Sequence, residues 1–188
     1  MMSGKYRIPF GKLDVGEAAR RYIERALSRN LVSEGENVRE FERRFAEKFG
    51  WRHAIATSSG TDAGIVAWSA VRELSSKLWG QGIVLTPACA FAATANCILA
   101  SGCNPRFVDI DLETLNMEVE TLTLDKIKIP ANIPTVIETV RDKRTLGINF
   151  VATMGKPTPA RDVAQIALEH DLKIVIDACE AHGATFEN

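Results

Sequence analysis

The chain has 188 residues, of which 46% are hydrophobic and 25% charged, as is usual for a soluble globular domain. The 23 basic and 24 acidic side chains give a net charge of −1. This balance argues against nucleic acid or an anionic membrane as the main partner. The four cysteines form no C-x-x-C pair and have no histidine at zinc-ligand spacing. We therefore expect no metal site and no disulfide framework, but reduced, buried thiols in a cytoplasmic protein.

One long uncharged stretch imitates a membrane span. Residues 81–105 carry no charged side chain, and their number alone would suffice to cross a bilayer. Pro87 interrupts the stretch early, however, and polar residues and alanines recur through the rest of it. Residues 1–14 also lack the apolar core of a secretion signal. We therefore interpret residues 81–105 as a strand, a loop and a buried helix.

The first fifty residues predict two helices. Residues 15–30 have helical spacing of apolar positions. Ser33 and Glu36 have the spacing of a capping box for a second helix, and Gly50 is expected to end it. An apolar stripe along this second helix indicates core packing rather than cofactor binding. Its members are Val38, Phe41, Phe45 and Phe49.

From residue 53 onward, strand-like and helix-like segments alternate. Strands are predicted at 53–57, 82–86, 105–110, 146–151 and 173–177, and helices at 60–78, 91–100 and 159–170. Residues 111–133 are rich in loop signals, and 134–144 is left between helix and loop. Alternation with short connections predicts a mostly parallel sheet covered by helices on both faces, an α/β three-layer sandwich. The strands are continuous apolar runs, as burial of both sheet faces requires.

In an open parallel sheet, ligands bind at the carboxyl ends of the strands. Ser58-Ser59-Gly60-Thr61 follows the first predicted strand and opens a helix. Free amides and the helix dipole would form an anion site there. A plain N-cap explains the same residues equally well. The chain contains neither a Walker A loop nor a G-x-G-x-x-G motif.

Two further strand ends carry candidate side chains. Phe91 follows the strand at 82–86, where it could pack in the core or offer a flat face for stacking. Asp177 ends the apolar strand at 173–177, where it could cap a helix or pair with a buried cation. The following segment offers too few ligands for a metal. A Cys179–His182 nucleophile pair would lack an orienting third group.

Taken together, the three strand ends offer a phosphate cradle, an aromatic face and a carboxylate. A phosphorylated, protonated aromatic heterocycle would satisfy all three, and pyridoxal 5′-phosphate (PLP) fits that description.

Four stretches carry a family resemblance: LVSEGENVREFERRFAEKFG, ATSSGTDAG, PACAFAATANCILASGCNPRFVDIDLETLN and VIDACEAHGA. The chain resembles the N-terminal part of the DegT/StrS-type sugar aminotransferases, which are fold-type I PLP enzymes. The resemblance implies that Gly60 and Thr61 contact the phosphate and that Phe91 stacks on the pyridine ring. It also implies that Asp177 pairs with the pyridinium nitrogen. Glu180 falls where the family usually has Gln or His near the phenolic oxygen, and an ionised glutamate would disfavour a phenolate there.

The sequence departs from the family in other places. It is longer than usual between Asn116 and Arg144, and residues 150–155 read FVATMG where relatives commonly have a His-Leu-Tyr-Gly-like run. In the family, the lysine that forms the Schiff base follows the aspartate by a few tens of residues. No lysine of this chain matches that motif, and we expect both Lys156 and Lys173 to be solvated.

The resemblance therefore implies that residues 1–188 are the N-terminal part of a PLP-binding large domain. We expect them to end before the Schiff-base lysine and the small C-terminal domain, and to be inactive alone. The complete enzyme would move an amino group from an amino acid to a nucleotide-linked keto-sugar. The alternatives are a PLP- or PMP-dependent sugar dehydratase, in which histidine replaces the lysine, and a short binding module without catalysis. An uncovered sheet edge predicts self-association, and relatives build their site at a homodimer interface.

Overall fold

The computed structural model describes residues 13–30, 33–75, 81–113, 115–117, 142–157 and 160–185. The chain divides into two compact units, Met1–Ala56 and Thr57–Asn188.

The first unit contains helices α1 (Glu17–Ser28) and α2 (Glu36–Phe49). The predicted capping box is wrong, because Gly35 is the N-cap residue of α2 and no side chain caps the helix. Gly35 adopts an extended conformation, with φ −142° and ψ −165°, that starts the helix without a side-chain acceptor. Gly50 ends α2 as predicted, because its φ of +70° lies in the left-handed region that glycine adopts without a Cβ penalty.

The phenylalanines of α2 pack against one another. The ring centroids of Phe41 and Phe45 lie 5.6 Å apart, and those of Phe45 and Phe49 lie 4.7 Å apart. Phe41 is nevertheless 55% exposed, so the predicted core role is wrong for this member of the stripe. In α2 the buried residue is Ala46.

The predicted strand at 53–57 is also wrong, since these residues pair with no strand in the described part of the chain. The backbone N–H of Ala56 instead donates to the carboxylate of Glu42 at 2.8 Å. A side chain of α2 thus takes the hydrogen bond that a neighbouring strand would have provided.

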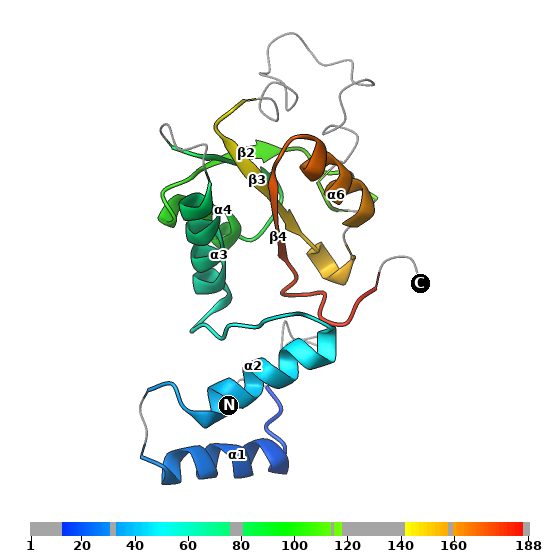
Figure 1. The fold of residues 1–188 in the computed structure, drawn as a ribbon. Helices are drawn as coiled ribbons and strands as arrows, with labels where there is room; N and C mark the ends of the chain where they lie inside the picture. Colours follow the sequence, from blue (N-terminus) through cyan, green and yellow to red (C-terminus); the bar gives the residue numbers. More distant parts are fainter. Residues whose placement is uncertain are drawn as a thin grey trace. The chain divides into compact units, whose positions relative to one another are not determined.

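The second unit is built from alternating helices and strands, shown in Figure 1. In chain order they are α3 (Gly60–Leu74), β1 (Ile83–Pro87), α4 (Ala92–Ala100), β2 (Asn104–Val108), β3 (Thr145–Val151), the 3-10 helix η2 (Thr153–Gly155), α6 (Ala160–Glu169) and β4 (Lys173–Asp177). Of the undecided segment 134–144, residues 142–144 are not helical and the others lie outside the described residues.

The strands form a parallel sheet in the order β2-β1-β3-β4. Helix α4 leads from β1 outward to β2, whereas α6 leads from β3 outward to β4 in the opposite direction. The strand order therefore reverses between β1 and β3. In open α/β sheets this switch point, at the carboxyl ends of the strands, is where ligands bind.

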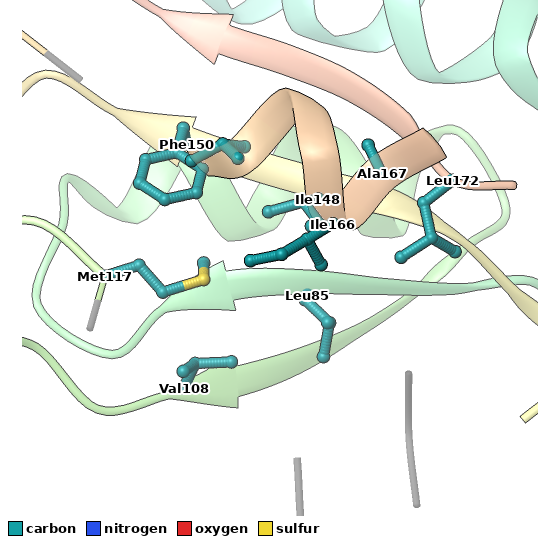
Figure 2. Packing of buried hydrophobic residues seen from close by; sticks show 9 residues of the cluster. Leu85, Val108, Met117, Ile148, Phe150, Ile166, Ala167 and Leu172 are labelled. Atoms are coloured by element: carbon teal, nitrogen blue, oxygen red, sulfur yellow. The ribbon is translucent and has the colours of Figure 1, made fainter. Parts of the chain in front are cut away.

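Each face of the sheet carries its own core. Leu85, Ile148 and Phe150 pack with Ile166 and Ala167 of α6 (Figure 2). Val163 of the same helix belongs to this cluster. The opposite face packs against α3 and α4 in a second cluster, composed of Trp68, Val84, Cys97, Ile98, Cys103 and Leu146. In Figure 1, α6 lies on one side of the sheet and α3 and α4 lie on the other. The predicted three-layer α/β architecture is confirmed, and it explains why the inner strands are apolar at consecutive positions.

The uncharged stretch 81–105 contains β1, α4 and the first residues of β2. Helix α4 has nine residues, which corresponds to a length of only about 14 Å. No helix in the described ranges is both long enough and apolar enough to cross a membrane.

Candidate functional site

The candidate residues lie where elements of the second unit begin or end at one edge of the sheet. Phe91 follows β1, the Thr153–Gly155 turn follows β3, and Asp177 is the last residue of β4. Because all paired strands are parallel, their carboxyl ends meet at the same edge. The topology thus brings segments that are far apart in the sequence to the same edge of the sheet.

The start of α3 combines an N-cap with unused backbone donors. Ser59 is the N-cap residue, and its hydroxyl oxygen accepts from the Asp62 N–H at 3.1 Å. The Ser58 and Ser59 hydroxyls donate to the Asp62 carboxylate and hold its pKa below the usual value. Within the described residues, the amides of Gly60 and Thr61 have no hydrogen-bond acceptor. The N-cap interpretation is therefore right, and two amides remain to bind an anion.

Asp177 is half-buried at the end of β4, with one carboxylate oxygen held by the protein. Its Oδ1 accepts from the Cys179 N–H at 3.2 Å, and turns rather than a helix follow. The helix-cap interpretation of Asp177 is therefore wrong. Val175 packs in the core of the α3–α4 face, so Asp177, two residues on, lies on the same face.

Cys179 links Asp177 to the start of α3. Its sulfur lies 3.4 Å from the position that a Cβ atom on Gly60 would occupy. The pKa of its thiol is raised to about 11, first by a hydrogen bond to the Asp177 carboxylate and then by burial. A thiol held neutral in this way is a poor nucleophile, which argues against a Cys179–His182 pair. Gly60 and Asp177 are 117 residues apart in the sequence, and both lie next to Cys179.

Phe91 lies outside both core clusters, and 79% of its surface is exposed. It is the N-cap residue of α4, with φ −63° and ψ 140°. The core-packing interpretation of Phe91 is therefore wrong, and its ring is accessible at the edge of the sheet.

Glu180 has a partner that the sequence did not reveal. Its carboxylate Oε2 accepts a hydrogen bond from the Met154 N–H at 2.5 Å. The run FVATMG at residues 150–155 departs from the family pattern and so marks this segment as unusual. Nothing in the local sequence, however, indicates that the Met154 N–H donates to a side chain 26 residues away.

The two lysines near these strands are exposed, as expected. The Lys156 ammonium donates to the Glu113 carbonyl oxygen at 2.8 Å. Lys173 begins β4, at the end of the strand opposite Asp177, and lies 3.6 Å from the Asp171 carboxylate.

All four cysteines are free thiols, but only Cys97 and Cys103 are buried. The expectation of buried thiols is therefore wrong for Cys89 and Cys179, which are exposed. Across the described part of the chain, no group of three or more His, Cys, Asp or Glu residues could hold a metal ion.

A parallel sheet covered by helices on both faces, with an acidic residue at the end of β4 and the start of α3 beside the same segment, defines an α/β protein with a candidate ligand site at the carboxyl edge of its strands. The model of the DegT/DnrJ/EryC1/StrS aminotransferase family matches residues 14–188, and the chain belongs to this family.

Relatives of known activity include both dehydratases and aminotransferases. The chain is 34% identical over 167 residues to dTDP-4-dehydro-2,6-dideoxy-D-glucose 3-dehydratase of Saccharopolyspora spinosa, covering 87% of this chain and 33% of that enzyme. The E. coli GDP-4-keto-6-deoxy-D-mannose-3-dehydratase with bound hydrated PLP superposes with a TM-score of 0.78 at 27% identity. That match covers 96% of this chain and 43% of the dehydratase.

The aminotransferase from Psychrobacter cryohalolentis superposes with a TM-score of 0.76 at 28% identity, covering 95% of this chain and 41% of that enzyme. The structural neighbours thus include PLP-dependent enzymes that act on nucleotide-linked sugars. The chain spans between one third and about two fifths of the length of these relatives.

Proposed function

We propose that this chain is the cofactor-binding part of a PLP-dependent enzyme that transfers an amino group from an amino acid to a nucleotide-linked keto-sugar. The observation that carries the proposal is the placement of Asp177. Its carboxylate lies at the carboxyl edge of the sheet with one oxygen held by Cys179, and Cys179 in turn packs against Gly60.

The described residues fit the chemical groups of PLP. The free amides of Gly60 and Thr61 suit a phosphate, and the accessible ring of Phe91 offers a face for stacking. Asp177 would keep a proton on the ring nitrogen, because a carboxylate beside it favours the charged form. When bound, the cofactor supplies an electron sink for bonds at the reacting carbon. The chain's own residues would bind and orient it.

The substrate class is inferred from relatives. The Saccharopolyspora spinosa relative acts on a dTDP-linked dideoxy sugar and the E. coli neighbour on a GDP-linked keto-deoxy sugar. A nucleotide-linked keto-deoxysugar is therefore the substrate that we propose for the complete enzyme, with an amino acid as the amino donor.

A 3-dehydratase is the second candidate, and two of the three relatives compared above have that activity. By resemblance, the distinguishing residue is the lysine that holds the cofactor, or the histidine that replaces it. By the same resemblance, we expect none of residues 1–188 to occupy that position. Mass spectrometry of the product of the complete enzyme, supplied with glutamate and a keto-deoxysugar nucleotide, separates the two activities. An aminotransferase gives an amino-sugar, whereas a dehydratase gives a sugar that has lost a hydroxyl group.

Cofactor binding can be tested on the 188-residue chain with pyridoxamine phosphate, whose amine cannot condense with surface lysines. We expect weak binding by the wild-type chain in a fluorescence titration, and at least tenfold weaker binding by Asp177→Asn. Asp171→Asn makes the same change before β4 and should bind like the wild type. Equal binding by both variants would overturn the role of Asp177.

The 188-residue chain should not transaminate, because no lysine in it matches the cofactor-holding motif. An assay of the half-reaction with glutamate and PLP checks this expectation, and robust turnover would contradict it.

Self-association is proposed from the edges of the described sheet. Ile176 on the edge strand β4 is 44% exposed, and Phe107 on the opposite edge strand β2 is 56% exposed. Exposed strand edges with apolar side chains favour pairing with another chain. Light scattering should show dimers or larger species at high protein concentration, and a monomer there would contradict the proposal.

A further inference from the structure

The Thr153–Gly155 turn is attached to the segment that follows β4. The Met154 N–H donates to the Glu180 carboxylate at 2.5 Å. The next residue, Gly155, lies so close to the backbone of Glu180 that an added Cβ would be 3.0 Å from the Glu180 carbonyl oxygen. Both the side chain and the main chain of Glu180 therefore contact this turn.

The backbone of the turn is unfavourable without such support. Met154 has φ +57° and ψ 23°, a left-handed conformation that side chains other than glycine rarely adopt. Gly155 follows with φ +77°. A hydrogen bond to an ionised carboxylate is stronger than one to a neutral acceptor. Glu180 thus provides the interaction that compensates for the strained residue.

A second contact holds the residue after the turn. The Lys156 ammonium donates to the Glu113 carbonyl oxygen at 2.8 Å, in the segment that follows β2. The turn after β3 is therefore tied to the segment after β4 on one side and to the segment after β2 on the other. These contacts fix the edge of the sheet at which the candidate site lies.

We propose that Glu180 is a positioning residue, whose carboxylate holds the Thr153–Gly155 turn and thereby fixes Met154 at the edge of the site. The Met154 side chain is 77% exposed, so it is available to a ligand there. That the ligands at this edge are the cofactor and the keto-sugar rests on the proposed function. The hydrogen bond from the Met154 N–H to Glu180 is formed within the chain and needs no ligand. It occupies the Glu180 carboxylate, which the family resemblance places beside the cofactor.

Selective labelling tests the contact directly. The chain has four methionines, so [15N]methionine labelling gives at most four amide signals, and Met154→Leu identifies the relevant one. We expect the Met154 amide to exchange with solvent at least tenfold faster in Glu180→Ala than in the wild type. Glu180→Gln should retain most of the protection, because its amide oxygen can still accept. Unchanged exchange in Glu180→Ala would overturn the proposal.

Two controls keep the test specific. The signal of Met117, which is buried at 1% exposure, should be unchanged and so reports an intact fold. Glu113→Ala should leave Met154 protected, because only the backbone oxygen of Glu113 is used.

Gly155→Ala is a second test of the contact. It keeps the Glu180 carboxylate but places a Cβ against the Glu180 carbonyl, so it too should expose the Met154 amide. Continued protection in Gly155→Ala would also count against the proposal.

Pyridoxamine phosphate separates positioning from direct cofactor contact. If Glu180 acts through the turn, Glu180→Gln binds this probe like the wild type, whereas Glu180→Ala and Gly155→Ala both bind it more weakly. If Glu180→Gln alone alters binding, Glu180 contacts the cofactor and the positioning role is wrong. If the wild type does not bind the probe, the proposed function fails, while the Met154 exchange result still decides the contact.

Discussion

The Cys179 sulfur lies 3.4 Å from the position of a Cβ atom on Gly60, so the segment after β4 packs against the first residue of α3. One of these segments carries Asp177 and the other carries the free amides that we assign to a phosphate. Their contact sets the spacing between the two parts of the proposed cofactor site, the amides that would hold the phosphate and the carboxylate that would pair with the ring nitrogen. Cys179 also reports on Asp177, because the hydrogen bond to its carboxylate is the largest of the causes, ahead of burial, that raise the pKa of the thiol to about 11.

Alkylation of Cys179 should therefore depend on Asp177. With a pKa of about 11, roughly one thiol in a thousand is ionised at pH 8. Asp177→Asn removes the negative charge, lowers the thiol pKa and should speed iodoacetamide labelling of Cys179 at least several-fold. Peptide mass spectrometry at timed intervals measures the rate. Cys89, exposed in the same sample, serves as the internal reference and should label equally in both proteins. An unchanged ratio of the two rates would contradict the proximity of Asp177.

A methyl group on Gly147 should strongly destabilise the sheet. A Cβ there would lie 2.1 Å from the Lys173 carbonyl oxygen, and β3 and β4 pair at this position. Because the obstacle is backbone, relief requires the strands to separate. We expect Gly147→Ala to lower the free energy of unfolding by about 2–4 kcal/mol, measured by urea titration.

Gly60→Ala is the matched control for Gly147→Ala. Its Cβ would meet the Cys179 sulfur at 3.4 Å, an ordinary van der Waals contact. The loss of stability should stay within about 0.5 kcal/mol. Similar losses in the two variants would show that the β3–β4 approach is looser than the structure indicates.

Much of the second unit could be predicted from the sequence, because its strands are buried on both faces and its connections are short. The strand at Lys173–Asp177 has the predicted bounds, and β1 at Ile83–Pro87 is shifted by one residue. Continuous apolar runs of this length leave little choice of element.

The errors concern partners that are distant in the sequence. Residues 53–57 have a strand-like composition, but the Ala56 N–H donates to the Glu42 carboxylate and not to a neighbouring strand. Glu180 resembles a cofactor contact by position, yet it accepts from Met154, 26 residues earlier. Neither partner leaves a periodic pattern, so local sequence could not reveal these contacts.

Trp68 should contribute to stability through a buried hydrogen bond. Its indole N–H donates to Asn149 Oδ1 at 3.0 Å, and the two residues are 0% and 3% exposed. Trp68→Phe leaves the Asn149 oxygen without this donor in a buried place. We expect a loss of about 1–3 kcal/mol in the free energy of unfolding. Trp51→Phe, at a site 65% exposed, should change it by less than about 0.5 kcal/mol. Equal effects would argue against the buried bond.

Acid should weaken the ion pair before β3. Hydrogen bonds from Arg144 hold the pKa of Asp142 at about 2, below its ordinary value of 3.8. A carboxyl group whose pKa is lower in the folded chain stabilises it above the ordinary pKa, and this contribution disappears as the pH falls through about 2. Arg144→Gln should therefore lower the urea midpoint at pH 5, and the difference from the wild type should shrink between pH 4 and pH 2. Carbon NMR of labelled aspartate should show the Asp142 pKa rising in the variant. Arg25→Gln, on the exposed surface of α1, should show no such pH dependence, and a constant difference for Arg144→Gln would contradict the assignment.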